Sequence, residues 1–176
     1  MPSSVKSYPV RRLCTDALLL CVALMLSYLE ALLPIVPLPG VRLGLAQLVV
    51  TVAYFRLGRA DAAAISAVRV ALMALLFGSV TSLYFSACGA LLAYLGLYLG
   101  DRLLRRRCSY IGLGVLCAAL HNVGQCLAAA TLFGVGVLLT YLPVLLAVAC
   151  ATGALGGIVV CALVGRIPVP KGGAAQ

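Results

Sequence analysis

Long runs of apolar residues alternate with short breaks along the whole chain. A helix needs about 20 apolar residues to cross the hydrocarbon core of a bilayer, which is about 30 Å thick. Windows of that length predict six helical spans, and Gly or Pro stands in most of the breaks between them. The predicted spans cover residues 13–33, 43–58, 61–79, 82–100, 110–133 and 138–165. The second span is the shortest and is predicted to start in the membrane interface.

The pattern therefore predicts an all-α integral membrane protein with six transmembrane helices and two short flanks. Residues 1–12 form a cytoplasmic N-terminal segment, residues 13–165 a six-helix membrane domain, and residues 166–176 a cytoplasmic tail. The first apolar run follows basic residues, as a signal peptide does. It lacks an A-x-A-like cleavage site and carries Glu30 in a long core, so we interpret it as a retained span.

Composition supports a membrane protein and excludes two other classes. Hydrophobic residues make up 64% of the 176 residues and charged residues 10%. In soluble domains about 45–50% of the residues are apolar and about 25% are charged. A disordered chain is poor in apolar residues, which excludes disorder. A soluble enzyme is disfavoured because too little polar material is present to cover its surface.

Basic residues predict the orientation of the chain. There are 13 Lys and Arg against 4 Asp and Glu. With the N-terminus inside, every Lys and Arg except Arg42 and Arg69 lies in the cytoplasm. The positive-inside rule then predicts a multi-pass protein of the bacterial cell (inner) membrane with both termini cytoplasmic. The basic run at 102–107 is either an anchor near anionic lipid or a docking site for a partner. Basic faces and motifs typical of nucleic-acid binding are missing, so no nucleic acid is expected.

The eight cysteines contain no C-x-x-C pair. Zinc sites need clustered ligands, and disulfide scaffolds are small secreted chains. We interpret these cysteines as small packing residues. Neither a metal nor a cofactor is predicted.

Polar residues at membrane depth indicate where a ligand would bind. Ionisable groups in lipid cost a few kcal/mol each, so they usually face a protein interior. Seven polar residues, named at the end of this paragraph, lie between the membrane midplane and the outer face when positions are counted along the spans. Their common depth predicts a polar cavity that is open to the outside. Tyr84, with Thr81 and Ser82, starts the fourth span at the same mouth. The buried polar set is Glu30, Arg42, Gln47, Arg69, His121, Asn122 and Gln125.

We expect Arg42 and Arg69 to bind an anionic group, with Glu30 paired to Arg69 to hold it in place. His121 and Asn122 would supply directional hydrogen bonds together with Gln125, which lies four and three residues further along the same helix face. Structural alternatives stay open. Arg69 is then a structural cation, Arg42 an interfacial anchor, and the His–Asn pair a set of hydrogen bonds between helices.

Several stretches resemble the Gx transporter family, also called heptaprenyl diphosphate synthase component I. They are PGVRLGLAQ (Pro39–Gln47), RVALMALLFG (Arg69–Gly78), Ser82–Tyr84, HNVGQ at 121–125 and Tyr141–Pro143. That family in turn resembles the S components of energy-coupling factor transporters, which capture vitamins from outside. The resemblance covers roughly residues 13–165 and implies an S-component-like bundle of six helices with a ligand pocket on the outer side.

Three functions follow as hypotheses. The favoured one is capture of a small vitamin-like or anionic metabolite for uptake. Because no G-x-x-x-x-G-K-[ST] loop is present, energy must come from transporter partner subunits or an ion gradient. The alternative is a non-catalytic membrane accessory of isoprenoid, quinone or flavin-linked redox metabolism, with membrane redox partners. The third is a structural scaffold.

The chain is not expected to be an enzyme. Prenyl diphosphate chemistry needs Mg²⁺ held by clustered carboxylates, and the four carboxylates here are isolated in the sequence. Pocket shape separates the first two hypotheses. A vitamin-like ligand predicts a closed polar pocket, and a lipid-sized ligand predicts an apolar pocket with a lateral opening.

Overall fold

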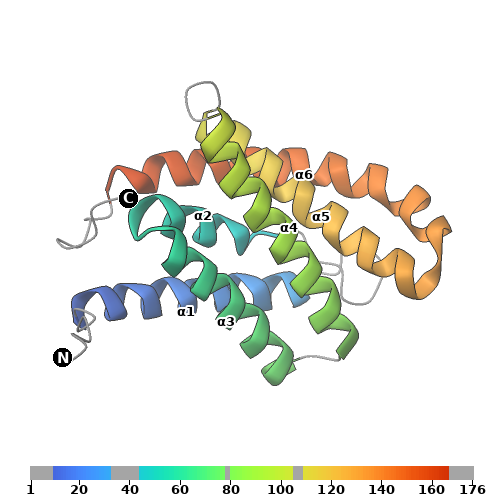
Figure 1. Ribbon diagram of the computed structural model, residues 1–176, viewed down its shortest axis with the longest axis horizontal. Coiled ribbons are helices and arrows are strands. Elements are labelled where there is room, and N and C mark those ends of the chain that lie inside the picture. Colours follow the sequence, from blue (N-terminus) through green and yellow to red (C-terminus); the bar gives the residue numbers. More distant parts are fainter. Residues whose placement is uncertain (1–9, 33–43, 78–79, 105–108, 167–176) are drawn as a thin grey trace, which may run out of the picture.

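The computed structural model describes residues 10–32, 44–77, 80–104 and 109–166, without the side chains at 77, 104 and 137–139. These residues form a bundle of six helices and no strand (Figure 1). The prediction of an all-α fold is confirmed. In chain order the helices are α1 (Val10–Leu32), α2 (Gln47–Arg56), α3 (Arg59–Phe77), α4 (Val80–Leu104), α5 (Tyr110–Phe133) and α6 (Val135–Val164).

Four of the six helices, α1, α4, α5 and α6, are long and apolar enough to cross a membrane. Helix α2 has 10 residues, so it is about 15 Å long at 1.5 Å per residue. It cannot cross the hydrocarbon core alone. Helix α3 has 19 residues and carries Arg59, Asp61 and Arg69. The structure therefore supports membrane spanning by four of the predicted segments.

Two predicted breaks are shorter in the structure than in the sequence pattern. Helix α3 begins at Arg59, inside the break expected at residues 58–61, and α4 continues through Asp101, which the pattern placed in a loop. Asp101 is 8% exposed and accepts a hydrogen bond from Tyr54 of α2. A buried polar partner thus lets the helix run past a residue that breaks the apolar pattern.

Glycines bring α4, α5 and α6 into backbone contact. A Cβ atom on Gly114 of α5 would lie 2.5 Å from the carbonyl oxygen of Gly153 on α6. A Cβ atom on Gly124 would lie 2.6 Å from the carbonyl oxygen of Cys88 on α4. Gly153 and Gly157, four residues apart on α6, both meet the backbone of α5, so this spacing of small residues lets the two helices pack closely.

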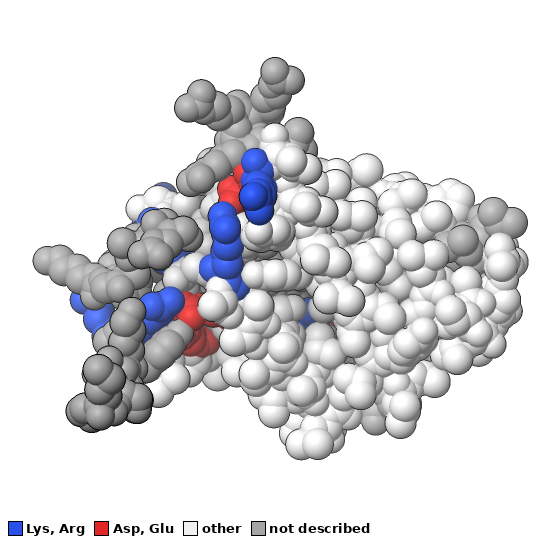
Figure 2. Space-filling model, in the orientation of Figure 1, with Lys and Arg blue, Asp and Glu red and all other residues white. Residues whose placement is uncertain are grey.

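Charged groups gather at one end of the bundle. Figure 1 shows that α1 begins and α6 ends at the same end, and Figure 2 shows arginine side chains gathered there on the visible face. All four acidic residues of the chain are buried or half-buried, so the charge exposed by the described residues is basic. The exposed arginines are Arg11, Arg59, Arg102 and Arg166. This distribution agrees with the predicted orientation.

We predict that the basic end lies in the cytoplasm. A fluorescent protein fused after Gln176 should fluoresce in bacterial cells, and alkaline phosphatase fused there should be inactive, because basic loops are retained inside. The matched control is a fusion after Gly134, which lies between α5 and α6 at the opposite end of the bundle. It should show active phosphatase. The reverse pattern at both positions would contradict the orientation.

Candidate functional site

The polar residues that the sequence places at membrane depth are buried in the structure. Packing between the helices, which the sequence does not show, buries each of these residues that the structure describes. The exposed fractions are 5% for Glu30, 2% for Gln47, 5% for Arg69, 2% for His121, and 0% for Asn122 and Gln125. Arg42 lies outside the described residues.

One face of α1 carries the partners of Arg69 and of the segment that enters α2. The Nη1 group of Arg69 donates to Ser27 Oγ across 3.3 Å. Glu30 accepts a hydrogen bond from the backbone N–H of Leu45. Ser27 and Glu30 are three residues apart, so they share this face. The face brings Arg69 and Glu30 into one region, and their direct ion pair stays a prediction.

His121 lies between α4 and the segment before α2. A Cβ atom on Gly89 would be 2.9 Å from the His121 ring and 2.9 Å from Gln125 Cγ. A Cβ atom on Gly44, whose φ is +83°, would be 3.1 Å from the ring on its other side. The Nε2 atoms of Gln125 and His121 are 3.1 Å apart. Glycine is needed at both positions because any larger residue would displace the imidazole.

Asn122 joins α5 to α6. Its Nδ2 group donates to the carbonyl oxygen of Leu145 across 2.8 Å. Its Oδ1 atom has no hydrogen-bond partner among the described residues, and the same holds for both amide atoms of Gln47 and for Ser86 Oγ. A buried polar group without a partner costs about 1–3 kcal/mol. The interior therefore retains unused donors and acceptors.

Tyr84 is not brought to this buried group. Its side chain is 40% exposed, and its hydroxyl lies 3.2 Å from Thr131 Oγ1 of α5. In contrast, Ser27 and Ser86 belong to the buried polar group although the sequence did not single them out. Their depth within long apolar helices was the one available signal, and it is weak because serine is common in membrane helices.

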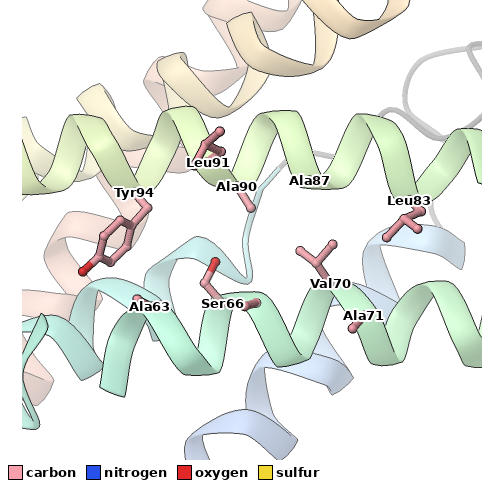
Figure 3. Close-up of a pocket in the computed structure, with 10 residues that line it drawn as sticks. Ala63, Ser66, Val70, Ala71, Leu83, Ala87, Ala90, Leu91 and Tyr94 are labelled. Atoms are coloured by element: carbon pink, nitrogen blue, oxygen red, sulfur yellow. The ribbon is translucent and has the colours of Figure 1, made fainter. Parts of the chain in front are cut away.

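Two cavities lined by described residues differ in size and character. Next to Gln47, at the junction of α2, α5 and α6, is a cavity of about 10 Å³, which is about the space of one water molecule. Between α3 and α4 is a groove of about 400 Å³ that is partly open to the surface (Figure 3). Its lining residues are Ala63, Ser66, Ala67, Val70, Ala71, Leu83, Ala87, Ala90, Leu91 and Tyr94.

The groove and the buried polar group share two helices. Val70 and Ala90 line the groove. Their chain neighbours Arg69 and Gly89 contact Ser27 and His121 inside the bundle. The apolar groove therefore lies at the same depth along α3 and α4 as the polar interior.

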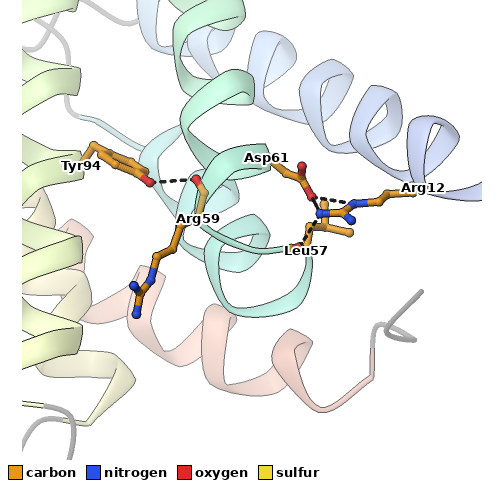
Figure 4. Close-up of polar contacts among 5 residues, drawn as sticks. All are labelled: Arg12, Leu57, Arg59, Asp61 and Tyr94. Carbon is orange, nitrogen blue, oxygen red and sulfur yellow. Dashed lines mark hydrogen bonds and ion pairs between the residues drawn. The ribbon is translucent and has the colours of Figure 1, made fainter. Parts of the chain in front are cut away.

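Ion pairs close the basic end of the bundle, and Figure 4 shows the one between Arg12 and Asp61. Arg12 of α1 binds Asp61 of α3 through Nε at 2.9 Å and through Nη2. Arg59 of α3 lies 3.8 Å from Asp101 of α4, and Tyr94 donates to the Arg59 carbonyl oxygen across 2.8 Å. Asp61 and Asp101 therefore each have a cationic partner. Among the described residues no three His, Cys, Asp or Glu residues are arranged to hold a metal ion.

The helices and the buried polar interior define an all-helical protein suited to the membrane. Residues 19–163 match the family model described as heptaprenyl diphosphate synthase component I. Because the match covers most of the chain, the protein belongs to the heptaprenyl diphosphate synthase component I family. Comparisons with curated proteins and with solved structures gave no match.

Proposed function

We propose that this protein is a membrane receptor that captures a small polar or anionic metabolite in the outer half of the bundle for uptake with partner subunits. The observation that carries the proposal is the set of buried polar atoms without partners on Gln47, Ser86 and Asn122. A packed apolar core would be more stable without them, since each costs about 1–3 kcal/mol. Ligand binding gives them a reason to be there, and because the cavity beside Gln47 is about 10 Å³, the surrounding helices must move apart to admit the ligand.

Neighbouring residues support the same proposal. Arg69, which is 5% exposed, brings a positive charge into the interior of the membrane helices. His121 and Gln125 lie within one turn of Asn122 on α5. A buried cation, together with buried amide and imidazole groups in the same bundle, suits a ligand with a carboxylate or phosphate and several hydrogen-bonding atoms.

The test separates binding from folding through Gln47. We predict that Gln47→Leu lowers ligand affinity at least about tenfold, as expected when 1.4 kcal/mol of hydrogen bonding is lost. The empty protein should melt at the same temperature or higher, because an amide without a partner has been removed from the core. Native mass spectrometry of the protein in mild detergent, with extraction and identification of the bound molecule, gives occupancy, and a thermal melt gives stability.

The matched control is Thr51→Val, one turn further along α2. Thr51 is 1% exposed and its hydroxyl donates to the Gln47 carbonyl oxygen across 3.0 Å, so it has a partner already. This variant should keep the ligand. Loss of stability in Gln47→Leu with no change of occupancy would contradict the proposal and favour a structural role for the polar interior.

A second function is supported by a different observation. The α3–α4 groove is apolar and opens to the side, the shape expected for a lipid-sized ligand. Its volume of about 400 Å³ falls within the range of about 300–1,000 Å³ found for ligand pockets. Together with the family's printed description, this supports a non-catalytic membrane accessory of isoprenoid or quinone metabolism that holds a lipid chain.

A further inference from the structure

The α3–α4 groove has different chemistry at its two ends. Figure 3 shows Tyr94 at one end and Leu83 at the other. Tyr94 donates its hydroxyl hydrogen to the carbonyl oxygen of Arg59, which starts α3 at the basic end of the bundle. Arg59 lies four residues before Ala63, so both are on the groove side of α3. The apolar groove thus ends next to a cation.

A second cation stands beside the first. The Arg59 guanidinium lies 5.2 Å above the ring of Tyr98 on α4. Arg102 Nη1 donates to the hydroxyl of the same tyrosine across 3.1 Å. Tyr98 is four residues after Tyr94, which places both arginines one turn beyond the end of the groove. Arg102 is exposed, and the Arg59 side chain is 47% exposed, so both can reach an outside ligand.

The acidic residue nearby offsets only one of these two positive charges. Asp101 is 11% exposed at its side chain and lies beneath Arg59 at 3.8 Å. It also accepts a hydrogen bond from Tyr54 at 3.1 Å, so its charge is held inside the bundle. The surface at this end of the groove is therefore positive.

We propose that the groove and the two arginines form one binding site for a single-chain lipid phosphate, with the chain between α3 and α4 and the phosphate on Arg59 and Arg102. The proposal deepens the second function above and does not depend on the polar interior. One apolar groove ending at two cations matches one chain with one anionic end. Small side chains at Ala63, Ala67 and Ala87 let that chain lie close to both helices.

The experiment measures binding of farnesyl diphosphate, farnesol and inorganic diphosphate to the full chain in mild detergent by native mass spectrometry. Replacing Arg59 and Arg102 together by Gln should weaken farnesyl diphosphate about tenfold and leave farnesol unchanged, because only charge-assisted hydrogen bonds are lost. Ala67→Leu with Ala87→Leu should weaken both prenyl compounds about tenfold by filling the groove. Inorganic diphosphate should bind weakly throughout.

Matched controls keep the test specific. Ala64→Leu places the same side chain at an exposed position of α3 outside the groove, and Arg166→Gln removes an exposed charge at the basic end on α6. Neither should change binding. Competition by phosphatidylglycerol, a two-chain anionic lipid, at equal strength would overturn the proposal, as would unchanged affinity in the arginine pair. If the leucine variants fail to fold, the ratio of farnesyl diphosphate to farnesol affinity in the arginine pair still decides.

Discussion

Gly114→Ala is expected to destabilise the protein by about 3 kcal/mol, at the upper end of the penalty for overpacking a core. The added Cβ would lie 2.5 Å from the carbonyl oxygen of Gly153 and 3.0 Å from the amide nitrogen of Gly157. Both atoms belong to the α6 backbone, so the two helices must move apart. A thermal melt in detergent should fall by about 6–12 °C.

Gly136→Ala is the matched control for this substitution. Gly136 lies in α6, is exposed, and a Cβ added to it would meet nothing within 4 Å. Alanine favours helix over glycine by up to about 1 kcal/mol, so this variant should melt at the same temperature or higher. Equal destabilisation by both substitutions would contradict the prediction, because the α5–α6 contact would then not explain the loss of stability at Gly114.

Asp61→Ala is expected to lower the free energy of unfolding by about 2 kcal/mol. Breaking a fully buried ion pair costs about 3–5 kcal/mol. The pair here is weaker because the Arg12 side chain is 22% exposed while that of Asp61 is 3% exposed. Arg12 also donates to the Leu57 carbonyl oxygen across 3.0 Å, and it keeps this acceptor when the carboxylate is removed.

A double-mutant cycle isolates this pair. Arg12→Ala, Asp61→Ala and the double variant are compared by thermal melts. The losses of stability in the two single variants, added together, should exceed the loss in the double variant by about 1 kcal/mol. Arg11→Ala, an exposed neighbour on α1, should change stability little. Additive losses would mean that the two residues act independently and that the ion pair does not hold α1 against α3.

Much of the fold could be predicted from the chain. Six apolar runs became six helices because helix formation and lipid compatibility depend on local composition and length. The weakest prediction was the second span. Its apolar run begins at residue 43, but α2 starts at Gln47. The chain turns at Gly44, whose φ of +83° is incompatible with a helix. A glycine conformation of this kind is set by what packs against it, which here is His121.

The candidate site could be predicted in outline. Counting residues from the span ends placed Arg69 and His121 inside the bundle, and both are buried. Counting could not tell that Asn122 bonds to Leu145 while Gln47 keeps both amide atoms without a partner among the described residues. Which polar atoms are satisfied depends on the rotation of each helix about its axis, and a small rotation moves a side chain from one neighbour to another.

The sequence by itself determined the class of protein, the helices and the positions of the polar residues along them, because these follow from the local order of apolar and polar residues. The tertiary structure alone decided the pairing of Arg12 with Asp61, 49 positions apart, and the apolar groove between α3 and α4. Both depend on where helices cross. That crossing is set by close backbone contacts such as Gly124 against Cys88, and no local pattern in the chain encodes which helix will be the neighbour.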